Sequence, residues 1–158
     1  MLAFTGRMYG LKKAEIAQRL PELLDLMELR DEPRKLIVEY SHGMKKKLSL
    51  ACALIHRPEI LFLDEPFEGV DVVTSRVIKE MLASYVERGS TIFLTSHVLD
   101  VVERLCTHVG IIAEGKLVEQ AALDELRQGS SLEERFLEKV GADPEVTQKL
   151  SWLEEAGS

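Results

Sequence analysis

Long apolar segments are missing from this sequence of 158 residues. No apolar run approaches the roughly 18 residues that a helix needs to cross a membrane. The N-terminal stretch MLAFTGRMYG is too short and too polar to form the apolar centre of a secretion signal. These absences predict a cytoplasmic chain, unless a partner protein holds it at a membrane surface.

Cysteine is scarce, and negative charge outweighs positive charge. Cys52 and Cys106 are far apart and form no CxxC pair, so neither a zinc site nor a disulfide framework is expected. The net charge of -7 argues against extended nucleic-acid binding, which relies on Lys and Arg contacts to phosphates. One short basic run, Lys45-Lys46-Lys47, is interpreted as a solvated helix face rather than a phosphate-binding patch.

Apolar residues follow a helical spacing in four segments and a strand pattern between them. The expected helices cover 14–29, 41–57, 72–88 and 98–106, and the expected buried strands cover 60–64 and 91–95, followed by a hairpin over 108–120 with a Glu114-Gly115 turn. Pro21 is expected to interrupt or kink the first helix. Strands that alternate with helices predict an α/β fold with a mostly parallel sheet.

Local signals predict a loop early in the chain and helices near its end. The segment DEPRK (31–35) is typical of a loop. Ser131 and Glu134 match a capping box, and Asp143-Pro144 fits an N-cap followed by proline at the first helical position. The C-terminal tail is therefore expected to be helical.

The stretch ILFLDEP (60–66) places two carboxylates at the end of a strand. Ligands of open parallel sheets bind outside the carboxyl ends of the strands, so Asp64 and Glu65 are expected at such an edge. One carboxylate there is suited to hold Mg²⁺, directly or through water. The other is suited to orient and deprotonate an attacking water.

Two further stretches predict polar groups near a ligand. TIFLTSH (91–97) ends a second strand in polar residues and places His97 near the same edge as Glu65. YSHGM (40–44) begins a helix, with Ser41 as N-cap and Gly43 allowing a ligand close to the backbone. The free N–H groups of a helix N-terminus favour phosphate.

Together and in this order, these stretches resemble the ATP-binding cassette (ABC) ATPases. YSHGM is similar to the signature motif, ILFLDEP to the Walker B segment, FEGVD (67–71) to the D-loop, and TSH (95–97) to the switch-histidine segment. IIAEGKLVEQ (111–120) is similar to the hairpin that usually follows, and the resemblance covers roughly residues 1–140. The residues of the signature motif and the tail SLEERFLE (131–138) are most similar to the subfamily that powers two-component exporters.

The resemblance implies a domain plan. It implies a mostly parallel sheet of the P-loop NTPase type with flanking helices, present here in incomplete form. Residues 1–57 would be the helical (signature) subdomain, residues 58–121 the second half of the ATPase core, and residues 122–158 a helical tail.

The resemblance also implies roles for individual residues. Glu65 would be the general base, Asp64 a carboxylate on the Mg²⁺ side that acts through water, and His97 a contact to the γ-phosphate of ATP. The remaining nucleotide-binding positions would be Ser41, His42, Gly43 and Asp71. Ser41 and Gly43 would bind the γ-phosphate held by an opposite subunit, and Asp71 would lie at the dimer seam.

Partners and location follow from the same resemblance. Two ATP-binding subunits would pair head to tail around ATP and Mg²⁺. A membrane permease would bind the helical subdomain, which would place the chain on the cytoplasmic face of the cell membrane. No nucleic-acid partner is expected.

The sequence departs from the family pattern at several points. The usual signature is LSGGQ, so His42 replaces a glycine and Met44 a glutamine, while Glu68 and Val70 are less common D-loop residues. A phosphate-binding loop, G-x-x-x-x-G-K-[ST], is absent from these 158 residues. The near match over 110–117 ends in leucine and has a strand-turn-strand context, so it is rejected.

The missing loop predicts an incomplete domain. The chain is expected to be a fragment, active as an ATPase only when an N-terminal half completes it, and inactive alone. Strands 60–64 and 91–95 should still pair in parallel, and 109–113 should pair with 116–120 rather than with 91–95. Apolar side chains that include Ile111, Phe93 and Leu94 should then be unusually exposed.

Three other functions are open on the sequence. A non-transport ABC ATPase, such as a DNA-repair type, should carry long heptads before the signature, and residues 1–40 have none. A helicase is suggested by DEPF, but the charge and the TSH segment argue against it. A truncated, non-catalytic partner-binding module is the third, and ATP binding by the pure chain separates it from the others.

Overall fold

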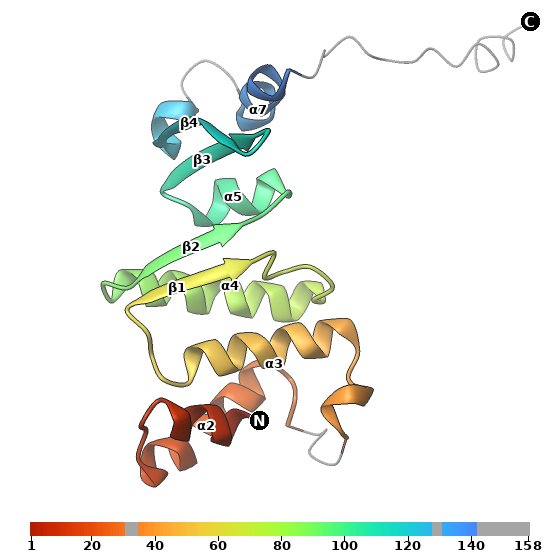
Figure 1. Cartoon of the computed structure of the whole chain (residues 1–158), viewed down its shortest axis with the longest axis vertical. Helices are drawn as coiled ribbons and strands as arrows, with labels where there is room; N and C mark the ends of the chain where they lie inside the picture. The colour runs from red at the N-terminus through yellow and green to blue at the C-terminus, as the bar shows by residue number, and fades with distance from the viewer. Residues whose placement is uncertain (31–34, 128–130, 142–158) are drawn as a thin grey trace, which may run out of the picture. The chain divides into compact units, whose positions relative to one another are not determined.

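The computed structural model describes residues 1–30, 35–127 and 131–141 (Figure 1). The chain divides into two compact units, one formed by Met1–His97 and one that begins at Val98. Each unit has its own cluster of buried apolar residues. Among the described residues, no helix is both long enough and apolar enough to cross a membrane.

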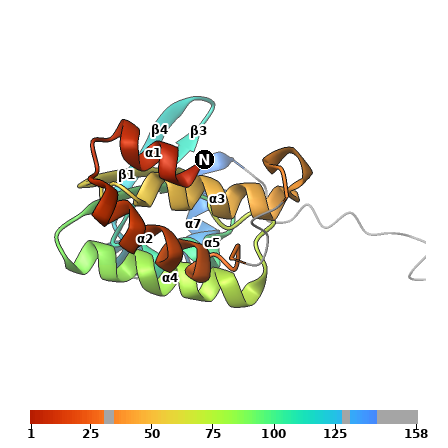
Figure 2. The same ribbon diagram turned by 90° about the horizontal axis from the view of Figure 1, so that it is seen from below.

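The first unit combines helices with a parallel pair of strands. Its elements are α1 (Leu2–Met8), α2 (Lys13–Leu26), the 3-10 turn η1 (Ile37–Glu39), α3 (His42–Leu54), β1 (Ile60–Asp64), α4 (Val72–Glu87) and β2 (Thr91–Thr95). Figure 2 shows α1 beside both α2 and α3, and α2 beside α4. The sequence pattern identified the longer helices and both strands, but it missed α1 and η1.

Helix α2 runs through Pro21 as one continuous helix, so of the two expected effects, interruption or a kink, the interruption is wrong. Proline removes one backbone hydrogen bond and crowds the preceding turn. Leu20, Leu23 and Leu24 lie on both sides of it and pack against the core of the first unit. Because most helix stability in a folded protein comes from such packing, one lost bond does not end the helix.

Strands β1 and β2 pair in parallel over five residues, from Ile60 opposite Thr91 to Asp64 opposite Thr95. This confirms the parallel α/β architecture predicted for these two strands. One face of β1 is buried, because Leu61 and Leu63 pack into the core that α3 and α4 share.

The other face of the strand pair is bare, so the expectation of buried strands holds for one face only. Ile60 is 56% exposed, Phe62 75% and Phe93 56%. The rings of Phe62 and Phe93 stack with their centroids 5.1 Å apart. The alternation of buried and exposed residues along β1 is the pattern of a sheet that is covered on one side only.

The second unit is a hairpin with short helices. Its elements are α5 (Leu99–Leu105), β3 (His108–Ala113), β4 (Lys116–Ala122), α6 (Leu123–Leu126) and α7 (Leu132–Val140). Glu114 and Gly115 both have positive φ, 50° and 73°, as a two-residue type I′ turn requires. The near match to a phosphate loop over 110–117 is therefore a strand-turn-strand, as expected.

Strand β3 pairs antiparallel with β4, in a sheet separate from that of β1 and β2, which confirms the expected pairing. The expected exposure holds for Phe93, but Ile111 is 4% exposed and Leu94 is half-buried. Of the three apolar side chains named in that prediction, only Phe93 is therefore open to solvent.

The capping box of the tail is present, because Ser131 and Glu134 each bond the other's backbone N–H at the start of α7. Gly141, in the left-handed conformation, ends this helix. The predicted start at Asp143-Pro144 lies outside the described residues, as does most of the expected loop over 31–35.

The two faces of β1 should respond differently to truncation. Leu63→Ala should lower the free energy of unfolding by about 2–5 kcal/mol, because it leaves a cavity in the core. Phe62→Ala on the bare face should cost less than about 1.5 kcal/mol, the scale of a lost aromatic pair. Urea unfolding of both variants measures this, and equal losses would contradict a sheet covered on one side only.

Candidate functional site

Polar side chains meet where β1 and β2 end. Parallel pairing sets Asp64 opposite Thr95, and the Thr95 hydroxyl donates a short hydrogen bond to the Asp64 carboxylate. The same hydroxyl accepts from the backbone N–H of Glu65 at 3.2 Å. Thr95 thus fixes both neighbouring acidic residues at this edge of the sheet.

Glu65 and His97 form the next contact along the same edge. One oxygen of the Glu65 carboxylate lies 2.9 Å from the backbone nitrogen of His97 and 2.8 Å from its ring Nδ1. Glu65 has a φ of 44°, in the left-handed region that non-glycine residues rarely adopt. The Glu65 side chain is 27% exposed and that of His97 72%, so the carboxylate is half-buried and the imidazole faces solvent.

The carboxylate favours the protonated form of the imidazole. Its hydrogen bond to Nδ1 and its negative charge raise the pKa of His97 above the ordinary value, with a smaller contribution from Glu68. A protonated ring donates from both nitrogens, and Nε2 then points a donor away from Glu65. The arrangement combines a proton acceptor with a cationic donor suited to a phosphate oxygen.

Lys46 joins α3 to this edge. Its ammonium donates to the backbone carbonyl of Glu65 at 2.9 Å and to that of Asp64 at 3.4 Å. It also pairs with the Glu68 carboxylate at 3.3 Å. The backbone that carries the two acidic residues is therefore bound to the second turn of α3.

The start of α3 packs against the loop after β1. Ser41 caps the helix, because its hydroxyl accepts from the backbone N–H of Met44 at 3.2 Å. A Cβ on Gly43 would lie 2.2 Å from the carbonyl oxygen of Gly69, so only glycine fits there. His42 is exposed, with Nε2 4.0 Å from the Glu68 carboxylate. Gly43 is therefore required by a contact within the chain, whether or not it also contacts a ligand.

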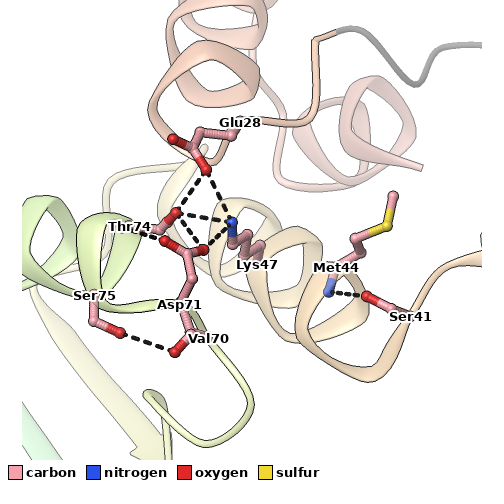
Figure 3. A network of polar contacts seen from close by, with 8 residues as sticks. All are labelled: Glu28, Ser41, Met44, Lys47, Val70, Asp71, Thr74 and Ser75. Atoms are coloured by element: carbon pink, nitrogen blue, oxygen red, sulfur yellow. Dashed lines mark hydrogen bonds and ion pairs between the residues drawn. The ribbon is translucent and has the colours of Figure 1, made fainter.

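Asp71 lies in a network that links three segments (Figure 3). Its carboxylate caps α4 by accepting from the backbone N–H of Thr74 at 2.8 Å, and it pairs with the Lys47 ammonium at 2.8 Å. The Glu28 carboxylate, in the turn after α2, lies 3.3 Å from the same ammonium and 2.8 Å from the Thr74 hydroxyl. Lys47 and then Thr74 hold the pKa of Asp71 well below its ordinary value.

The interpretation of Lys45-Lys46-Lys47 as a solvated face is wrong for two of its members. Lys47 is 9% exposed, Lys46 is half-buried, and only Lys45 is exposed. The helical period could have shown this, because Lys47 comes three residues before Leu50 and four before Ala51, both of which are buried.

The structure gathers the seven predicted residues into two groups. Asp64, Glu65 and His97 share the sheet edge, while the other four lie at the start of α3 and of α4, which are Ser41, His42, Gly43 and Asp71. Lys46 and Glu68 connect the two groups. Sequence reasoning assigned no function to either connecting residue.

The sheet edge suits one mode of metal binding. The described residues contain no cluster of three or more His, Cys, Asp or Glu side chains able to hold a metal ion alone. Mg²⁺ keeps several waters and is usually bound through one or two carboxylates together with phosphate oxygens. Asp64, exposed beside the Thr95 hydroxyl, fits that mode when a phosphate supplies the other ligands.

Comparison with known proteins agrees with this geometry. The family model described as ABC transporter matches residues 4–68. The bacitracin transport ATP-binding protein BcrA of Bacillus licheniformis is 39% identical over 128 residues, which cover 80% of this chain and 41% of that protein. The chain belongs to the ATP-binding family of ABC transporters.

A further relative and a solved structure agree with this family assignment. A Nod factor export ATP-binding protein of Cupriavidus metallidurans is 38% identical over 125 residues, covering 79% of this chain and 41% of that protein. A solved ATP-binding subunit of an ABC transporter superposes with a TM-score of 0.82 at 31% identity, covering 87% of this chain and 60% of that one. The chain spans about half the length of the curated relatives it matches.

The Glu65–His97 pair of this ABC chain should be visible in a pH titration. A raised pKa means that the protonated ring stabilises the fold fully below about pH 6.5, and that this contribution is lost as pH rises through the folded-state pKa. Glu65→Gln should lower the pKa of His97, measured from its ring protons by NMR. Glu80→Gln, which removes a remote carboxylate, should leave it unchanged. Equal values in the chain and in Glu65→Gln would contradict the pair.

Gly43 should be intolerant of a side chain even without a ligand. Gly43→Ala should lower the free energy of unfolding by about 1–3 kcal/mol, because the new Cβ meets the Gly69 carbonyl. His42→Ala, at the exposed neighbouring position, should change it by less than about 0.5 kcal/mol. Chemical unfolding compares the two, and a harmless Gly43→Ala would show that the contact is not tight.

Proposed function

We propose that this chain is part of an ATP-hydrolysing subunit of an ABC exporter. The observation that carries the proposal is the Glu65–His97 pair, held at 2.8 Å beside Asp64 where two parallel strands end. A half-buried carboxylate within reach of a water, next to a cationic donor, suits attack of that water on a terminal phosphate.

In this proposal Glu65 takes the proton from the attacking water. His97 holds the γ-phosphate through Nε2, while its Nδ1 keeps the Glu65 carboxylate in place. Mg²⁺, when bound on the Asp64 side, neutralises charge on the phosphate oxygens. Lys46 keeps the backbone of both acidic residues fixed during this step.

The second group of residues serves the neighbouring subunit. We propose that Ser41, His42 and Gly43 at the start of α3 face the γ-phosphate of an ATP bound by an opposing copy. Free N–H groups at this helix end favour a phosphate there. Asp71 would lie near the seam between subunits, although its carboxylate is already engaged by Lys47 and Thr74.

The transport role is proposed from relatives and from surface character. Two relatives are named for bacitracin transport and Nod factor export, which favours an exporter. Within residues 1–57, Phe4, Met8 and Val38 are 62%, 70% and 76% exposed. We propose that a permease binds this helical region and holds the chain at the cytoplasmic face of the membrane.

A second candidate is a non-catalytic module that binds another polypeptide. It is favoured by the bare apolar face of β1 and β2, where Ile60, Phe62 and Phe93 are exposed. Together with the missing phosphate-loop motif, this face suggests that the domain is completed by a further segment. Both candidates share that requirement and differ in whether the completed domain hydrolyses ATP.

The chain alone should bind ATP weakly. A phosphate loop supplies the backbone donors and the lysine that hold the β- and γ-phosphates, and the motif is absent from these residues. Calorimetry with Mg-ATP should give a dissociation constant weaker than about 100 μM, or roughly -5.5 kcal/mol. Tighter binding would show that the chain holds nucleotide by other means.

Hydrolysis should depend on Glu65 in a completed domain. The bacitracin transport relative of Bacillus licheniformis can receive this chain in place of its matching segment. In that chimera Glu65→Gln should reduce ATP turnover by about 10²–10⁴-fold while ATP binding persists, because an amide cannot accept the proton. Glu80→Gln is the matched control. A Glu65→Gln effect within about threefold would exclude the base role, and a chimera that binds ATP without turnover would favour the non-catalytic module.

A further inference from the structure

A pocket in the first unit lies away from the sheet edge. It has a volume of about 680 Å³ and lies between α2, the residues after α3, and the end of α4. It shares no residue with the Asp64, Glu65 and His97 cluster or with the start of α3. The pocket is therefore separate from the residues of the proposed ATPase site.

The polar lining of this pocket consists mainly of hydrogen-bond donors. Three guanidinium groups line it, those of Arg19, Arg57 and Arg88, against the single carboxylate of Glu22. Among the described residues, no ion pair involves Arg57 or Arg88. This is an unusual concentration of positive charge in a chain whose net charge is -7.

Arg19 is held in place before any ligand arrives. Its guanidinium donates to the carbonyl of Ile55 at 2.8 Å and pairs with the Glu15 carboxylate at 3.2 Å. Such anchoring lowers the entropy cost of binding, because the side chain is already ordered. The planar group retains further N–H donors for a second acceptor.

Tyr85 provides a second and separate indication of a ligand. Its hydroxyl is buried and has no hydrogen-bond partner among the described residues, and Tyr85 lines the pocket. A buried polar atom normally has a hydrogen-bond partner, so this hydroxyl requires one that the described residues do not supply. Burial raises the pKa of this hydroxyl, while the charges of Arg57 and Arg19 oppose that rise.

Carboxylates and helix ends near the pocket offset its positive charge, but they do not occupy the donors of Arg57 and Arg88. Arg57 and Arg88 follow the C-terminal ends of α3 and α4, each of which carries about half a negative charge. Two such ends, Glu22 and the Glu15 carboxylate that pairs with Arg19 amount to about three negative charges, against three guanidinium groups. The total charge is therefore about balanced, and a ligand would be bound by the N–H donors of Arg57 and Arg88, which have no carboxylate partner among the described residues.

The remaining lining is partly apolar and partly polar, and its polar members are Gln18, Ser84 and Ser90. Leu23, Leu26, Leu54 and Met81 line the pocket together with the donors. We propose that this pocket binds a small organic oxyanion, with a phosphate or carboxylate group against Arg19, Arg57 and Arg88 and an apolar body against the leucines. A planar guanidinium group can donate two parallel hydrogen bonds to two oxygens of a phosphate or carboxylate. The compact ammonium group of a lysine does not offer this geometry.

The test uses phenyl phosphate and inorganic phosphate with the 158-residue chain. Phenyl phosphate should bind at least about fivefold more tightly, because its ring covers the apolar lining. Backbone amide shifts in a ¹H–¹⁵N NMR titration should concentrate at the residues around the pocket. Shifts spread over all basic residues, or equal affinity for both anions, would overturn the proposal.

Variants separate the pocket from general attraction to positive charge. Arg57→Gln combined with Arg88→Gln should weaken phenyl phosphate binding at least about tenfold, and Tyr85→Phe about threefold. The matched control combines Arg76→Gln with Arg104→Gln, which removes two exposed guanidinium groups that pair within their own helices. The proposal would be overturned if the test and control double variants lost equal affinity for phenyl phosphate. It would also be overturned if Arg57→Gln combined with Arg88→Gln left that affinity unchanged.

Discussion

The buried ammonium of Lys47 constrains the rest of the first unit. A charge that is 9% exposed must be paired, because its desolvation in an apolar interior costs several kcal/mol. Glu28, Asp71 and Thr74 satisfy it, and they come from three different segments of the chain. The turn after α2, helix α3 and the start of α4 therefore have one mutual arrangement in which this charge is compensated.

That arrangement determines where the candidate site can form. The network fixes α3 against the loop after β1, and this brings Lys46 to the backbone carbonyls of Asp64 and Glu65. Gly43 then meets the Gly69 carbonyl so closely that no side chain fits between them. The start of α3 and the edge of the sheet are thus joined by direct contacts.

Much of this was readable from the sequence, for physical reasons. Helices α3 and α4 follow a strong apolar period and begin at Ser41 and Asp71, whose side chains cap them. The position of His97 beside Glu65 follows from parallel pairing, because the two strands end at the same edge. Pro21 misled the prediction, since propensity is local and the packing around the helix is not. The exposure of one face of β1 could not be predicted either, because an apolar run such as ILFLD does not show which side of the strand is covered.

The polar connections were harder to predict than the elements, because they depend on tertiary placement. Nothing in the local sequence places Lys46 near the carbonyl of Glu65, nineteen residues away along the chain. That contact bears on the backbone of Glu65, whose left-handed conformation costs about 1–3 kcal/mol in a residue with a side chain. Such a conformation persists only where its surroundings hold it. The Thr95 hydroxyl holds the Glu65 nitrogen, and Lys46 holds its carbonyl. Because this unfavourable turn aims the Glu65 carboxylate at His97, the strain at the site is offset by the same contacts that connect it to α3.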